Sequence, residues 1–170
     1  MNEFKTMTQE QTTLQWLSER QGIDLSGNKE HQELAAFFLL WTTFEKIYFQ
    51  ETKAGTHNKH SLEKIKIAAS KICADYSELL NSIDEWYFRG KEHDYFFRKF
   101  SGQKKAYKDF FKDYLEKEEH TPEEEKVFVL AIIYQYRCNA FHGSKELGPA
   151  AHRQRKKIGM FNRFLIACLD

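Results

Sequence analysis

The chain has 170 residues with a formal net charge of +1, and 41% of them are hydrophobic. This length suits a single domain, residues 1–170, that can bury a core without disulfides or metals. The near-zero charge excludes an overall polycation. Two prolines and eight glycines leave few positions for turns, which favours an all-α fold.

The three cysteines, Cys73, Cys138 and Cys168, are widely separated and form no CxxC pair, so we expect neither disulfides nor a zinc site. His57 and His60 are three residues apart, but their loop context favours solvated side chains over a metal site. No stretch is long and apolar enough to span a membrane, and the first residues lack the pattern of a secretion signal. We therefore expect a cytoplasmic protein without metal, cofactor or membrane partner.

Three helices are predicted in the first half of the chain. A short polar helix covers residues 8–21, and a strongly amphipathic helix covers residues 28–50 with apolar side chains at three- and four-residue spacing. After a polar loop over 51–59, one long periodic helix is expected from residue 61 to about residue 88, ended by Gly90.

Glu45 follows the apolar face of the helix over 28–50 closely. At the edge of the core it could pair with an arginine from another helix. The frequencies of buried glutamates favour a second interpretation, a solvated side chain next to Lys46.

Aromatic and basic residues alternate over 91–117. Such a pattern can bind single-stranded nucleic acid through stacking and phosphate contacts. The rings also have the spacing of two short amphipathic helices broken at Ser101 and Gly102, and we favour this second interpretation, with the rings in the core and the lysines on a solvated face.

The stretch over 121–143 predicts the central helix. Thr121 and Glu124 form a capping box and Pro122 suits the first turn. After Lys126 the sequence is apolar almost all round, as in a helix that lies inside a bundle.

Polar residues appear together at the far end of this helix. Arg137 continues the stripe of Leu130 and Ile133, so we expect it to be partly buried. Asn139 and His142 follow, and Gly143 is placed to end the helix.

A last helix is expected over 158–170. A basic run precedes it after a loop over 144–151, and loop geometry could bring this run beside the same polar cleft. Its candidate RNA-binding residues are Arg153, Arg155, Lys156 and Lys157.

Arginine, asparagine and histidine together are suited to phosphodiester chemistry. Cleavage of RNA without a metal needs a base for the 2′-hydroxyl proton, an acid for the leaving oxygen and a cation for the phosphoryl charge. One chain offers one histidine here, His142, so a two-fold dimer would supply the second. The alternative is that Arg137 is tied to a buried acid and His142 caps the helix.

The segment from Arg137 to Gly143, RCNAFHG, resembles the Arg-x4-6-His signature of the HEPN superfamily, and the helix around Glu45 resembles that family's early aromatic helix. The resemblance implies an antiparallel helical bundle that dimerises through the motif helices. It also implies a metal-independent endoribonuclease of toxin-antitoxin, abortive-infection or other phage-defence systems, with an antitoxin or larger assembly as a possible partner. Arg137 and His142 match the catalytic pair, and Asn139 and Glu45 would support it.

Two further functions remain open. A non-catalytic HEPN-like module would bind RNA, a nucleotide or a protein through the same cleft. A helical interaction protein without a nucleic-acid role would require Arg137 to be fully neutralised inside the monomer.

Overall fold

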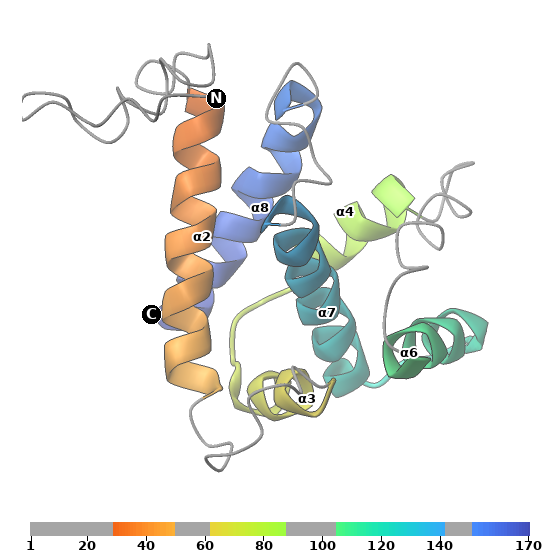
Figure 1. Cartoon of the computed structure of the whole chain (residues 1–170). Helices are drawn as coiled ribbons and strands as arrows, with labels where there is room; N and C mark the ends of the chain where they lie inside the picture. The colour runs from red at the N-terminus through yellow and green to blue at the C-terminus, as the bar shows by residue number, and fades with distance from the viewer. Residues whose placement is uncertain (1–28, 50–61, 88–104, 142–150) are drawn as a thin grey trace, which may run out of the picture.

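The computed structural model of the chain describes residues 29–49, 62–87, 105–141 and 151–170. These residues form helices and no strand, so the prediction of an all-α fold is confirmed for them. The helices are α2 (Lys29–Tyr48), α3 (Leu62–Lys71), α4 (Ser77–Tyr87), α6 (Lys105–Glu116), α7 (Pro122–Phe141) and α8 (Ala151–Leu169) (Figure 1). The expected helix over 8–21 and the residues 51–59 and 91–104 lie outside the described part.

Helix α7 is the centre of the fold, as its sequence predicts. Every residue from Val127 to Tyr136 is buried. The capping box is formed: the Glu124 amide donates to Thr121 Oγ1 at 3.2 Å, and the Thr121 amide donates to Glu124 Oε2 at 3.0 Å. Two of the amides that a helix start leaves without partners are thereby satisfied.

Helices α2 and α8 pack against each other beside α7. Phe37 of α2 and Phe161 of α8 lie 6.1 Å apart between ring centroids, and both contact Tyr136 of α7. Asn162 of α8 donates to the Glu33 carbonyl at 3.0 Å and to its carboxylate at 2.8 Å. Helix α7 runs opposite to both helices, whereas α2 and α8 run in the same general direction (Figure 1). The arrangement is therefore not antiparallel throughout.

The single long helix expected from 61 to 88 is wrong, because the chain breaks between α3 and α4. At the break, Asp75 accepts a hydrogen bond from the Ser77 amide at 2.9 Å. Lys126 of α7 donates to the Ile72 carbonyl at 2.7 Å, and the Tyr76 hydroxyl donates to Glu125 at 2.8 Å. The Ile72 carbonyl, which has no helical partner at the break, thus finds a donor on α7, and the Tyr76 side chain adds a second bond to that helix.

Helix α8 begins at Ala151, earlier than the predicted start at residue 158. The basic run therefore lies within the first turns of this helix and not in a loop. Arginine, lysine and glutamine are strong helix formers, so the run extends the helix despite its charge. The later part of the helix packs into the core through buried side chains, which are Met160, Phe161, Phe164, Leu165 and Cys168.

Candidate functional site

Arg137 lies where the buried part of α7 ends. Tyr136 before it is buried, whereas about a quarter of the Arg137 side chain, 26%, is exposed. This matches the expected continuation of the apolar stripe toward the surface. The guanidinium is therefore held at the edge of the core, where both protein and solvent can reach it.

Glu45 of α2 faces this guanidinium. Its Oε2 atom lies 3.9 Å from Arg137 Nη2, and 22% of the glutamate side chain is exposed. The separation is that of an ion pair without a short hydrogen bond. Of the two interpretations of Glu45, the pairing with an arginine of another helix is the one that the structure shows.

Aromatic rings hold α2 and α7 together beside the ion pair. Trp41 stacks on Phe44 at 5.3 Å and contacts Tyr134 at 6.0 Å, and Tyr134 stacks on Tyr107 of α6 at 6.0 Å. Burial raises the pKa of the Tyr107 and Tyr134 hydroxyls, so both stay neutral in the physiological range. These packed rings leave little freedom for the backbone that carries Glu45 and Arg137.

Two buried polar atoms near the ion pair have no hydrogen-bond partner among the described residues. They are Trp41 Nε1, a donor, and Glu45 Oε1, an acceptor. Buried polar groups are usually satisfied by protein, water or a ligand. These atoms show that the region beside Arg137 has hydrogen-bonding capacity that the described protein groups do not use.

Two residues of the predicted motif are not placed beside Arg137. Asn139 belongs to the last turn of α7, but its side chain is not described, and His142 lies outside the described residues. The predicted helix stop at Gly143 also lies outside them. The structure therefore brings together Glu45 and Arg137 from the predicted site.

The basic run divides into different environments. Lys156 is exposed and lines a cleft between α2, α4 and α8 together with Arg163, Glu33 and Glu78. The Lys157 ammonium lies 5.4 Å from the centre of the Trp86 ring, in a cation–π contact. For Arg153 and Arg155 only the backbone, in the first turns of α8, is described.

Three of the four aromatic residues of α6 belong to the core. Tyr107, Phe111 and Tyr114 are buried, and the Tyr114 ring stacks on Phe128 of α7 at 4.0 Å. Buried rings cannot stack on nucleic-acid bases, so the favoured core interpretation is confirmed for these residues. Lys112 lies on the solvated face, paired with Glu116.

A second hollow, not predicted from the sequence, is a cleft between α3, α6 and the start of α7. Its signal in the sequence is the density of acidic residues over 113–125, which hold seven carboxylates and a single lysine.

In the described parts of the chain, no group of three or more His, Cys, Asp or Glu side chains could hold a metal ion, and no helix is long and apolar enough to cross a membrane.

No protein-family model matches the chain, and neither a curated protein nor a solved structure does. The function therefore has to be argued from the chain's own residues.

Proposed function

We propose that the protein is a metal-independent endoribonuclease of the HEPN type, with its active site at the C-terminal end of α7. The observation that supports this most is the partly exposed Arg137 guanidinium, held between packed helices five residues before His142. A fixed cation at the edge of a core is suited to binding a phosphate.

In this mechanism the ribose 2′-oxygen attacks the neighbouring phosphorus and the bond to the 5′-oxygen breaks, which leaves a 2′,3′-cyclic phosphate. His142 takes the proton from the 2′-hydroxyl or gives a proton to the leaving 5′-oxygen. Arg137 stabilises the negative charge on the phosphoryl oxygens. Asn139 would orient either the catalytic pair or the phosphate. Attack and departure each need a proton transfer, so a homodimer through the motif helices would supply a second histidine.

Glu45 would support the site because its carboxylate attracts the Arg137 guanidinium. At 3.9 Å it attracts the guanidinium without forming a short hydrogen bond, so a substrate phosphate can compete for the same cation. The basic residues at the start of α8 would add phosphate attraction for RNA that extends from Arg137 to this helix, namely Arg153, Arg155, Lys156 and Lys157. A role in toxin-antitoxin or other phage-defence systems, under the control of an antitoxin or larger assembly, follows from the HEPN resemblance alone. A cytoplasmic location follows instead from the widely separated cysteines.

A binding module without catalysis is the second candidate, and the ion pair is the observation that favours it. A carboxylate beside the arginine lowers the positive charge available to a transition state. The module would bind RNA, a nucleotide or a protein through the same cleft. A purely structural arginine fits less well, because Arg137 keeps a quarter of its side chain exposed.

A cleavage assay on a mixed RNA pool with excess chelator tests the proposal. The wild type is compared with His142→Ala and Arg137→Ala, and Lys112→Ala is the control because Lys112 is also a cation paired with a glutamate, Glu116, at 3.7 Å. We expect chelator-resistant cutting with cyclic phosphate ends, lost in the first two variants and kept in the control.

Circular dichroism and the molar mass in solution must first show that all variants are folded in the same oligomeric state. RNA binding without cutting by the wild type would favour the binding module. If the wild type neither cuts nor binds RNA, the ribonuclease and an RNA-binding module are both rejected, and a module that binds a protein is left. Cutting that survives His142→Ala would reject the mechanism.

A further inference from the structure

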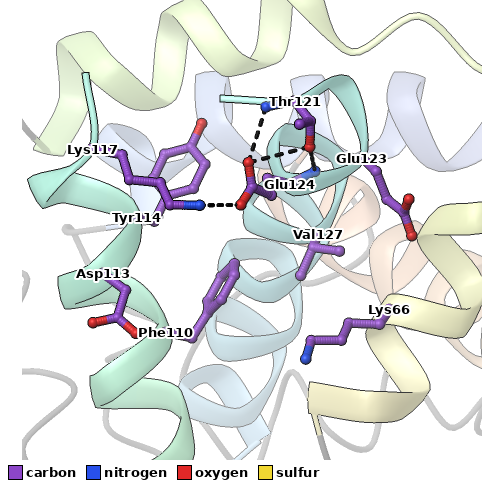
Figure 2. Close-up of a pocket in the computed structure, with 9 residues that line it drawn as sticks. All are labelled: Lys66, Phe110, Asp113, Tyr114, Lys117, Thr121, Glu123, Glu124 and Val127. Carbon is purple, nitrogen blue, oxygen red and sulfur yellow. Dashed lines mark hydrogen bonds and ion pairs between the residues drawn. The ribbon is translucent and has the colours of Figure 1, made fainter. Parts of the chain in front are cut away.

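The cleft missed by sequence analysis lies at the opposite end of α7 from Arg137. Helices α3 and α6 flank the first turns of α7, and Figure 2 shows the side chains that line the space between them. The cavity volume is about 500 Å³, which is in the range of ligand and peptide pockets, roughly 300–1,000 Å³. It is large enough to hold several side chains of a bound segment.

The inner wall of the cleft is apolar and firmly supported. Phe110 and Val127 face the space from α6 and α7 (Figure 2). The Phe110 ring packs edge-on against Phe111 at 5.5 Å and lies 6.2 Å from Tyr114. Because Phe111 and Tyr114 belong to the core, Phe110 is a half-buried ring on a rigid base and can contact an apolar side chain.

The two lysines of the cleft already have carboxylate partners. Lys117 bonds to Glu124, whose carboxylate also accepts from the Thr121 amide, and Lys66 pairs with Glu63 at 3.2 Å. The Lys117 hydrogen bond, followed by the Thr121 amide, lowers the pKa of Glu124 to about 2. These contacts hold one side of the cleft in a fixed, charge-paired form.

Two further carboxylates on the rim, Asp113 and Glu123, are exposed and form no ion pair with the described residues. They stand on opposite sides of the apolar wall, one on α6 and one on α7 (Figure 2). They belong to the acidic stretch over 113–125, so the surrounding potential is negative. Such a rim repels nucleic acid and attracts cations that are attached to an apolar body.

We propose that this cleft is a docking site for a basic, amphipathic peptide segment of a partner protein. An apolar side chain of the segment packs on Phe110 and Val127, and flanking lysines or arginines pair with Asp113 and Glu123. Short helices with apolar anchors on one face bind grooves between helices in this way. The inference is independent of the ribonuclease proposal, because the cleft shares no residue with the Arg137 site.

Selection from a displayed random library of short linear peptides tests the proposal with the full chain at physiological salt. We expect enriched peptides to combine lysine or arginine with leucine or aromatic residues. Synthetic copies should compete with one another and bind more weakly as salt is raised. Enrichment of acidic peptides, or of none, would overturn the proposal.

Variants then locate the binding by fluorescence anisotropy with the strongest selected peptide. The double variant Asp113→Asn/Glu123→Gln should weaken binding about fivefold, from two exposed ion pairs. Phe110→Ala should weaken it about tenfold through lost apolar contact. The double control Glu85→Gln/Asp170→Asn removes two exposed carboxylates outside the cleft and should leave binding unchanged. Equal binding by all variants would place the peptide elsewhere and reject the site.

Discussion

Glu45 and Arg137 are far apart in the sequence, yet Oε2 of the first lies 3.9 Å from Nη2 of the second, and each side chain is about a quarter exposed. An ion pair in this setting has two possible uses. It can stabilise the contact between α2 and α7, or it can hold a guanidinium ready for another anion. A mainly structural pair would give a large coupling between the two side chains in the free energy of unfolding, whereas a guanidinium held ready for another anion would give a small one.

A double-mutant cycle with Arg137→Ala, Glu45→Ala and the combined variant measures the first use. Because both groups are partly solvated and their separation exceeds a hydrogen bond, we expect a coupling of about 0.2–1 kcal/mol in the free energy of unfolding. Urea denaturation of the four proteins gives this value. A coupling well above that range would mean that the pair is mainly structural.

The two helices that carry this pair were predictable from sequence, but the pair itself was not. The capping box at Thr121 and the apolar run after it predict helix α7. The spacing of Phe37, Trp41 and Phe44 predicts helix α2. Periodicity offered the core edge as one position for Glu45, although the low frequency of buried glutamates favoured a solvated side chain. Which arginine it meets depends on how α2 and α7 approach each other, and that is a tertiary property.

The break between α3 and α4 shows the same limit. The apolar periodicity continues through Ile72 and Tyr76, so a local pattern favours one helix. The partners that stabilise the break, Glu125 and Lys126, are about fifty residues further along the chain. The cleft beside Phe110 was also missed, because its walls come from three separate helices.

Lys126 tests whether α7 stabilises that break. Its ammonium donates to the Ile72 carbonyl at 2.7 Å in a partly buried setting. Lys126→Met keeps the aliphatic chain but leaves the carbonyl without this donor, so we expect a loss of about 1.5–3 kcal/mol in the free energy of unfolding. Lys46→Met, at an exposed position of α2, is the control. Equal urea midpoints for both variants would show that the bond contributes nothing.

The lowered pKa of Glu124, at the start of α7, predicts that the free energy of unfolding depends on pH. The Lys117 hydrogen bond and then the Thr121 amide lower its pKa to about 2, below the usual value of 4.5. Because the pKa of Glu124 is lower in the folded state than in the unfolded state, its ionised form stabilises the protein at pH values above the unfolded-state pKa of about 4.5. This contribution is lost as the pH falls from about 4.5 toward 2. Glu124→Gln should therefore be less stable than the wild type at neutral pH.

The difference between Glu124→Gln and the wild type should shrink as the solution is acidified through that window. Urea unfolding at several pH values measures it, and Glu85→Gln, an exposed site on α4, serves as the reference. A difference that stays constant down to acidic pH would contradict the assigned contacts. The comparison between variants matters more than either curve alone, since other carboxylates titrate in the same range.

The second use of the ion pair concerns RNA, and Glu45→Gln separates it from the first. At 3.9 Å the glutamate acts on Arg137 through charge alone, and the same negative charge repels a phosphate that approaches the guanidinium. Glutamine keeps the size of the side chain and removes that charge. We therefore expect RNA to bind about two- to fivefold more tightly, a gain comparable to one partly exposed ion pair.

Fluorescence anisotropy with a labelled single-stranded RNA, in a His142→Ala background that prevents cutting, measures the affinity. Weaker binding by the Glu45→Gln variant would instead assign the carboxylate the task of orienting Arg137, and unchanged binding would place the phosphate away from this pair.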